Sequence, residues 1–353
     1  ALASSGRPFP FSLLCSSPNH ADLPYTRFMS LLGVLIGYLT ICPLIGAHSK
    51  LTPHYLADSD YDYEKCGMTN VLSRVKRYGG DDFYDALSFT ATHPRTMAQR
   101  GEAPWAVAIE YGDEVCAGTL ISRRHVATAA HCILDGPLKV DGFGQHCDRG
   151  QFHNLTEYMA GATVRWGGEC LEREKEGCTA EMVAQRARIS KVVVFPFFEG
   201  ECRTGSDLML LELAQSTDVP HACLPHLHDP SDLSVFSQFS SFGWSARGSD
   251  AGPLHNRLRL YRLGLQRDIC EEIWSVLSPD VICLPERPDI QHCSGDSGSG
   301  LLTQLRHRTF LLGVHTRATM CRERRATEAA FTDIRLFTAT IDHELGIVPP
   351  FPF

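Results

Sequence analysis

The sequence predicts an all-β fold that ends in one helix, and three observations support this prediction. From about Pro104 onward, short runs of β-branched and apolar residues alternate with Gly, Pro, Asp and Ser. Apolar residues make up 43% of the chain and charged residues only 21%, which is enough to bury a core and excludes a disordered protein. At ~150 residues per domain, the 353 residues correspond to about two structural units.

Five apolar runs are the expected strands, each bounded by turn residues. They cover residues 105–111, 118–121, 191–195, 208–213 and 310–314. Helical spacing occurs in the last segment, residues 334–345, where Ile334, Phe337, Ile341 and Leu345 alternate with polar residues. This spacing predicts an amphipathic C-terminal helix.

The N-terminal region predicts a secreted chain. Residues 31–47 are apolar, follow Met29 and end in small residues, which is the pattern of a signal peptide. A membrane anchor is the alternative, but these 17 residues include Pro43 and fall short of the ~20 that span a bilayer. We therefore expect no stable membrane anchor, a signal peptide over residues 29–49, and an untranslated or unstructured leader over residues 1–28.

The cysteine content also favours an oxidising, extracellular location. The chain has fourteen cysteines and no Cys-x-x-Cys pair, which indicates a disulfide framework rather than zinc or redox chemistry. Signal-peptide cleavage would remove Cys15 and Cys42 and leave an even number. The sequon at Asn154 predicts a glycan on an exposed loop.

The net charge argues against a nucleic-acid partner, and a local cluster of basic residues predicts a processing site. With 33 basic and 41 acidic residues, the net charge of -8 provides no large cationic surface, so nucleic acid is not an expected partner. Residues 50–100 are acidic and turn-rich, but they contain the basic cluster 74–77. We interpret this cluster as a proteolytic processing site rather than a solvated loop, and residues 50–100 as a propeptide or light chain.

Two motifs offer a base and a carboxylate for acyl-transfer chemistry. Residues 126–132 (VATAAHC) end an apolar run in His131, and the adjacent Cys132 would lock its position. Asp207 directly precedes an apolar strand, where its carboxylate becomes buried and needs a donor such as an imidazole N–H. Each motif alone also has a structural explanation, as a core histidine or a turn residue.

A third motif offers the nucleophile. Residues 293–298 (CSGDSG) place Ser297 in a glycine-flanked turn, where the N–H groups of Gly295 and Ser297 can converge on a developing negative charge. Hydrolysis of an amide needs a nucleophile, a base, an acid that orients the base, and oxyanion donors. The three motifs together provide all four.

In the order His, Asp, Ser, these motifs resemble the chymotrypsin-fold, trypsin-like serine endopeptidases. The resemblance covers residues 98–345, and residues 101–105 are similar to the family's Gly-x-x-Pro-Trp segment. It implies two six-stranded antiparallel Greek-key β-barrels with the triad in the cleft between them. Residues 101–345 would form this peptidase domain, and residues 346–353 a tail.

The resemblance also implies the role of each site residue. His131 would be general base and then acid, Asp207 would set its tautomer, and Ser297 would form the acyl-enzyme. Gly295 and Ser297 would donate to the oxyanion, and Asp296 would receive a new N-terminal ammonium after zymogen cleavage. No metal or organic cofactor is required, and the expected partners are protein or peptide substrates and protein inhibitors of proteases.

The resemblance further implies four disulfides. They pair Cys116 with Cys132, Cys270 with Cys283, Cys293 with Cys321, and Cys66 with Cys223. Cys147, Cys170, Cys178 and Cys202 remain, with three possible connectivities. These four and the sequon lie between His131 and Asp207, in a segment that we interpret as a disulfide-stapled insertion.

The chain departs from the family at its activation site. The family's Ile-Val-Gly-Gly start should fall near residues 92–95, which read Thr-His-Pro-Arg. Cleavage after Arg77, Arg95 or Arg100 would instead expose Tyr, Thr or Gly. The activating cleavage therefore stays open.

The predicted substrate pocket differs as well. Its floor is Gln291 rather than an Asp, so no preference for Lys or Arg substrates is predicted. Its walls are His315 and Arg317 on one side and Ala329 on the other, and Arg317 would narrow the mouth or favour an acidic or small residue. The alternative is that these residues fill a disused pocket.

We weigh three functions. The first is a secreted serine endopeptidase made as a zymogen. The alternative is a catalytically inactive homologue that acts as a binding or regulatory module, against which the intact triad argues. A metal module is disfavoured, because the chain's His-Cys pairs lack the spacing of metal ligands.

Overall fold

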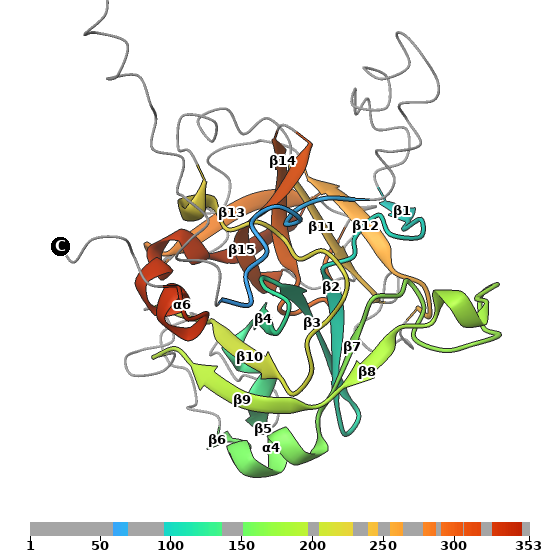
Figure 1. Cartoon of the computed structure of the whole chain (residues 1–353), viewed down its shortest axis with the longest axis horizontal. Coiled ribbons are helices and arrows are strands. Elements are labelled where there is room, and N and C mark those ends of the chain that lie inside the picture. Colours follow the sequence, from blue (N-terminus) through green and yellow to red (C-terminus); the bar gives the residue numbers. More distant parts are fainter. Residues whose placement is uncertain are drawn as a thin grey trace, which may run out of the picture. The chain divides into compact units, whose positions relative to one another are not determined.

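Two antiparallel sheets of seven strands form the framework of the fold (Figure 1). The computed structural model describes residues 59–69, 95–135, 151–196, 205–228, 239–245, 255–263, 278–286, 291–305, 307–318 and 327–347. The expected signal peptide, leader, basic cluster 74–77 and residues 348–353 lie outside these ranges. Among the described residues, no helix has the length and apolar character needed to cross a bilayer.

The first sheet has the strand order β8-β7-β2-β3-β4-β10-β9. Its strands are β2 (Ala106–Tyr111), β3 (Glu114–Leu120), β4 (His125–Thr128), β7 (Thr163–Trp166), β8 (Gln185–Ala187), β9 (Ile189–Val194) and β10 (Met209–Leu213). A separate two-stranded ribbon joins β5 (Leu134–Asp135) to β6 (Gln151–Phe152). All residues of β4 are buried, including the polar His125 and Thr128, and in β10 only Glu212 is partly exposed.

The second sheet has the order β1-β12-β11-β14-β15-β16-β13. Its strands are β1 (Arg95–Met97), β11 (Phe239–Gly243), β12 (Arg259–Leu263), β13 (Val281–Glu286), β14 (Gly300–Leu305), β15 (Arg308–Ala318) and β16 (Thr327–Asp333). The fold class is therefore as predicted, mostly β with two curled antiparallel sheets and a C-terminal helix. Within the described ranges each sheet has seven strands, where the resemblance implied six-stranded barrels.

The C-terminal segment is helical, as its spacing predicted. A 3-10 turn, η6 (Ile334–Leu336), precedes α6 (Thr338–Glu344), and the buried side chains are Ile334, Ile341 and Leu345. The helix is tied to the first sheet by an ion pair between Lys191 and Glu344, whose Nζ and Oε2 atoms are 2.5 Å apart.

The segment between His131 and Asp207 contains a short helix that the sequence did not predict. In α4 (Leu155–Gly161), the side chain of Asn154 caps the first turn by accepting from the Thr156 N–H at 2.9 Å. Asn154 is exposed, as a glycan acceptor must be, but it is a helix cap rather than a loop residue. In the same segment, Cys170 pairs with Cys178. This pair excludes the two connectivities in which Cys170 bonds to Cys147 or to Cys202. Cys147 and Cys202 lie outside the described residues.

Two of the four implied disulfide pairings are confirmed. Cys66 is bonded to Cys223 and Cys116 to Cys132. Cys283 and Cys293 are also disulfide-bonded. Their implied partners, Cys270 and Cys321, lie outside the described residues.

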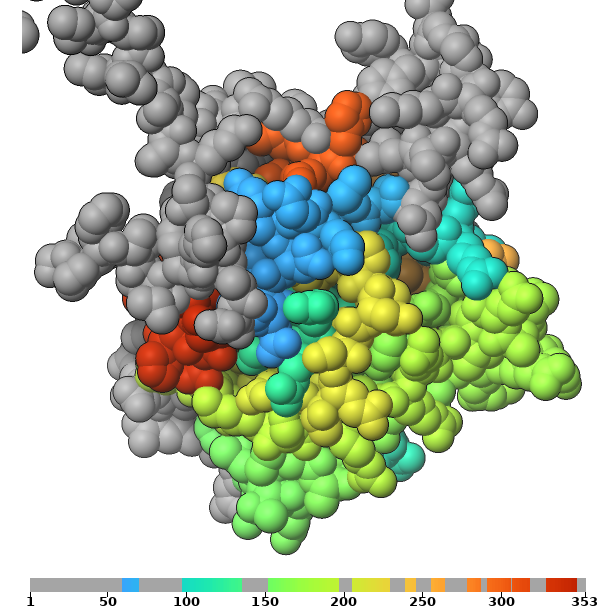
Figure 2. All heavy atoms as spheres, viewed as in Figure 1, coloured from blue at the N-terminus to red at the C-terminus, as the bar shows by residue number. Residues whose placement is uncertain are grey.

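Residues 59–69 form a strap that docks on the folded body (blue in Figure 2). Tyr61 and Cys66 are buried, and the Gly67 N–H donates to the His221 carbonyl at 2.6 Å. Gly67 also accepts from the Thr309 N–H at 2.9 Å. A side chain at Gly67 would lie 2.5 Å from the Thr309 backbone, so only glycine permits this approach.

His221, beneath this strap, makes stability depend on pH. Its ring donates from Nδ1 to the Ala222 carbonyl at 2.9 Å, and its Nε2 accepts from the Asp62 N–H, also at 2.9 Å. The contact at Nε2 requires the neutral ring, because a protonated Nε2 cannot accept from the Asp62 N–H. Burial lowers the pKa of His221 to about 4. The unfolded chain takes up this proton below about pH 6.5 while the folded chain does not. Stability is therefore complete above that pH and falls as the pH approaches 4.

We expect this histidine alone to lower the free energy of unfolding by roughly 2 to 3 kcal/mol between pH 7.5 and pH 4.5. Urea unfolding at the two pH values measures the loss, which His221→Gln should reduce. His343→Gln, at an exposed histidine, is the control that should leave it unchanged. Equal pH dependence in all three proteins would contradict the assignment.

Candidate active site

His131 is positioned by the end of β4 and a covalent lock. The chain leaves the buried strand β4 and turns through η2 (Ala130–Ile133), which contains His131. The neighbouring Cys132 is bonded to Cys116 in β3, so the turn cannot drift from the sheet. The His131 side chain is 19% exposed, and its backbone N–H donates to Asp207 Oδ1 at 2.8 Å.

Asp207 lies immediately before β10, as predicted, and its side chain is nearly inaccessible. Gly205 and Ser206 have φ values of +86° and +59°, and this turn delivers the carboxylate into the interior. Asp207 Oδ2 accepts from His131 Nδ1 at 2.7 Å and from the Thr316 hydroxyl. Burial opposes ionisation, but His131 and Thr316 outweigh it and lower the pKa of Asp207.

This pairing determines what His131 can do. With Nδ1–H directed at a carboxylate, the lone pair of the neutral ring lies on Nε2, which is the atom that can accept a proton. Burial of the ring opposes protonation, but the charge of Asp207 and its hydrogen bond raise the pKa of His131. His131 is thus a base whose protonated form is stabilised.

Thr316 is a site residue whose role sequence reasoning missed. It lies between His315 and Arg317, the predicted wall residues of the pocket, and its hydroxyl is the second side-chain donor to Asp207. Thr332, one strand away in β16, also donates to the Asp207 carbonyl at 3.1 Å. A Thr in an alternating strand carries no local signal for such a contact, because the two residues are far apart in sequence.

The Ser297 turn needs its glycines. Gly295 and Gly298 have φ values of +98° and +84°, which other residues rarely adopt. A side chain at Gly298 would lie 2.2 Å from Thr128 Oγ1 and 2.3 Å from the Ala117 carbonyl oxygen. The turn therefore presses directly against the strands that position His131.

Two contacts place Ser297 beside the His131 turn. The Ser297 carbonyl accepts from the Ala117 N–H at 2.7 Å, and the Cys132 sulfur lies 3.9 Å from the same oxygen. Ala117 and Cys132 belong to the first sheet region and Ser297 precedes β14 of the second, so the two sheets meet at this site. Among the described residues, the N–H groups of Gly295 and Ser297 donate no hydrogen bond.

The predicted pocket residues are mostly buried. Gln291, His315 and Ala329 are almost inaccessible, and Arg317 is half-buried. The His315 ring stacks on His292 with centroids 4.4 Å apart. Burial lowers the pKa of His315 well below its usual range, so its ring is neutral at pH 7.

Comparison with known proteins agrees with this geometry. The family model "Trypsin" matches residues 94–341. The trypsin-like protease try-5 of Caenorhabditis elegans is 35% identical over 251 residues, which cover 63% of this chain and 75% of that protein. Two CLIP domain-containing serine proteases of Anopheles gambiae, B15 and B8, are 26% and 25% identical, over 61% and 69% of this chain. The matches cover 59% and 58% of those two proteins.

Proposed function

The chain belongs to the trypsin-like serine protease family, and from this premise we propose that it is a secreted serine endopeptidase that cuts peptide bonds through an acyl-enzyme. The observation that supports this most strongly is the coupling of His131 Nδ1 to a buried Asp207 at 2.7 Å. A general base needs such a carboxylate, because it holds the proton on Nδ1 and leaves the lone pair of Nε2 free to accept.

In the proposed reaction, Ser297 Oγ attacks the carbonyl carbon of the scissile bond while His131 Nε2 accepts its proton. The N–H groups of Gly295 and Ser297 hold the oxyanion that forms. When the C–N bond breaks, His131 returns the proton to the leaving amine. Water then attacks the ester in the same way, with His131 as base, and releases the acid and free Ser297.

The substrates in this proposal are proteins or peptides, and the residue before the scissile bond is not a Lys or Arg. Gln291 at the pocket floor offers no negative charge, and Arg317 adds a positive one. Burial lowers the pKa of the Arg317 guanidinium, and the nearby Asp207 carboxylate opposes this shift. The uncharged Gln291 and the positive charge of Arg317 favour small or acidic substrate side chains.

Secretion and glycosylation belong to the same proposal. The disulfides support an extracellular location, since such bonds persist in oxidising compartments. Asn154 is exposed and available as a glycan acceptor. The zymogen form stays a prediction. The hydrogen bonds of Asp296, described below, favour an active site that is ordered before any cleavage.

A second candidate is a homologue without activity. The burial of Gln291, His315 and Ala329 favours it, because a filled pocket would admit no substrate side chain. Such a protein would keep the fold as a binding module.

Covalent labelling by a fluorophosphonate probe separates the two candidates. We expect the secreted protein to be labelled and Ser297→Ala to lose all labelling, because the probe needs the nucleophile and its base. Ser294→Ala, at an exposed serine in the same turn, is the control and should be labelled at the parental rate. Folded protein that is never labelled, before or after limited proteolysis, would favour the inactive homologue.

A further inference from the structure

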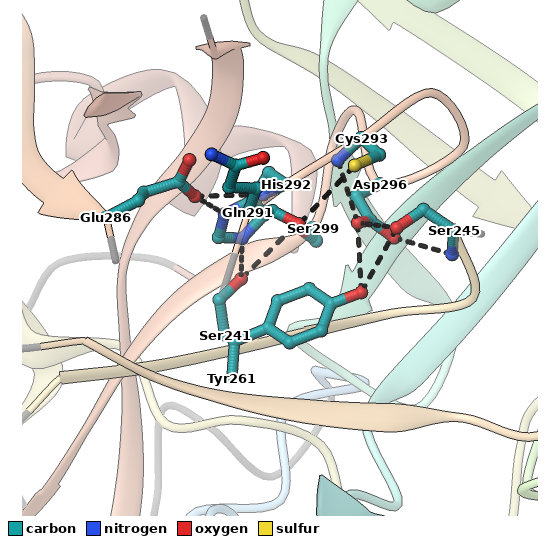
Figure 3. Close-up of polar contacts among 9 residues, drawn as sticks. All are labelled: Ser241, Ser245, Tyr261, Glu286, Gln291, His292, Cys293, Asp296 and Ser299. Carbon is teal, nitrogen blue, oxygen red and sulfur yellow. Dashed lines mark hydrogen bonds and ion pairs between the residues drawn. The ribbon is translucent and has the colours of Figure 1, made fainter. Parts of the chain in front are cut away.

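Asp296 is fully buried, and its carboxylate accepts four hydrogen bonds (Figure 3). Oδ1 accepts from the Ser245 N–H at 3.0 Å. Oδ2 accepts from the Tyr261 hydroxyl at 2.9 Å, from the Cys293 N–H at 3.1 Å and from the Ser245 hydroxyl. All four donors are neutral groups of the chain itself.

These donors already stabilise the Asp296 charge that a new N-terminal ammonium would otherwise neutralise. Oδ2 accepts three of the four hydrogen bonds and Oδ1 accepts one, so neutral donors already contact both oxygens of the carboxylate. The backbone also closes on the acid, since a side chain at Gly243 would lie 1.8 Å from Asp296 Oδ1. A new N-terminus would therefore meet a carboxylate whose charge the chain's own donors already stabilise.

The donors belong to strands that exist before any cleavage. Tyr261 lies in β12 and pairs with Ser241 of β11, and Ser245 follows the end of β11. Both Tyr261 and Ser245 are fully buried. On its other edge β12 pairs with β1, the strand at which an activating cleavage after Arg95 would fall.

A second group of contacts holds the nucleophile turn from its other side. The His292 backbone N–H donates to Glu286 Oε1 at 2.9 Å, and the His292 ring contacts the same carboxylate. His292 Nε2 lies 2.9 Å from Ser241 Oγ, which is 3.2 Å from Ser299 Oγ. The Tyr261 ring packs edge-on against His292 at 4.9 Å. Figure 3 shows both groups of contacts on the turn that contains His292, Cys293 and Asp296.

We propose that Tyr261 and Ser245 are positioning residues that hold Asp296, and with it the oxyanion donors of residues 293–297, in the uncleaved chain. They do so in place of a new N-terminal ammonium. The inference rests on the proposed function for its catalytic consequence, but the ordering of the turn is a separate physical claim. A buried network whose donors and acceptors are paired rigidifies the segment that it joins.

Labelling kinetics of the uncleaved protein test the catalytic consequence. Intact mass establishes that the secreted protein is a single chain, and the fluorophosphonate labelling rate is measured before and after proteolysis of the segment 77–100. We expect the uncleaved chain to be labelled at the rate of the cleaved one. Tyr261→Phe and Ser245→Ala should each slow labelling about ten- to a hundredfold, because each removes a hydrogen bond to a buried charge.

Tyr158→Phe is the matched control, since Tyr158 is a buried tyrosine in α4 whose hydroxyl has no partner among the described residues. It should be labelled at the parental rate. Labelling that appears only after cleavage, and that Tyr261→Phe leaves unchanged, would overturn the proposal.

Hydrogen exchange tests the ordering without any need for activity. In uncleaved Ser297→Ala protein, the hydrogen-bonded amides of the turn should be protected, namely those of Cys293, Asp296, Gly298 and Ser299. Tyr261→Phe or Ser245→Ala should expose them. The β2–β3 hairpin should exchange at the same rate in all variants, which excludes general unfolding. If the turn is protected but no form is labelled, the endopeptidase function fails and the positioning role stands. Protection that arises only on cleavage would overturn the positioning role itself.

Discussion

Asp207→Asn is expected to lower kcat about 10⁴-fold while the protein stays folded. In the parent, Asp207 Oδ2 accepts from both His131 Nδ1 and the Thr316 hydroxyl. An amide retains the shape of the carboxylate but directs an N–H₂ group or a weaker acceptor at the imidazole. The ring then favours the tautomer with its proton on Nε2, which cannot accept a proton from Ser297.

The measurement is turnover of a peptide substrate selected from a library, together with the labelling rate. Asp218→Asn is the matched control, because Asp218 is an exposed acid of the same sheet region. It should retain parental turnover. If Asp207→Asn stays within tenfold of the parent, Asp207 has no role in orienting the base.

Removal of the Cys66–Cys223 disulfide should produce the largest loss of stability. The bond joins residues 157 positions apart and fixes the strap at residues 59–69. In the chain-entropy view, a bond that closes so long a loop contributes about 5 kcal/mol to the free energy of unfolding. The double replacement Cys66→Ala with Cys223→Ala should lose most of this in urea unfolding of the uncleaved protein.

The Cys170–Cys178 bond provides the comparison. It spans 8 positions, and the same entropy argument gives it about 2.5 kcal/mol. The double replacement of this pair with Ala should therefore cost about half as much. Equal losses for the two pairs would show that loop length does not govern stability here.

Much of the site could be predicted because its parts are local. His131 with Cys132, Asp207 before its strand, and Ser297 between glycines are each defined by residues within a few positions. Local sequence sets turn geometry, since the φ values of Gly295 and Gly298 are ones that glycine accepts without strain. The structure then brings His131 and Asp207 together, 76 positions apart.

Strand existence was predicted better than strand length. Residues 105–111 and 208–213 match β2 and β10 closely, because these strands are buried on both sides and read as apolar runs. β15 extends over Arg308–Ala318, well beyond the predicted 310–314. Its ends pair with β14 and β16, and backbone pairing extends a strand through residues whose side chains give no apolar signal.

The sequence by itself determined the fold class and the family resemblance, and it predicted His131, Asp207 and Ser297 as the site residues. Only the tertiary structure decided how these residues are supported. Thr316 reaches Asp207 across 109 positions, and Tyr261 reaches Asp296 across 35. The physical reason is that a side-chain hydrogen bond forms between neighbours in space, and strand register determines which residues become neighbours. No local pattern contains that information, so the residues that hold the site follow from the fold alone.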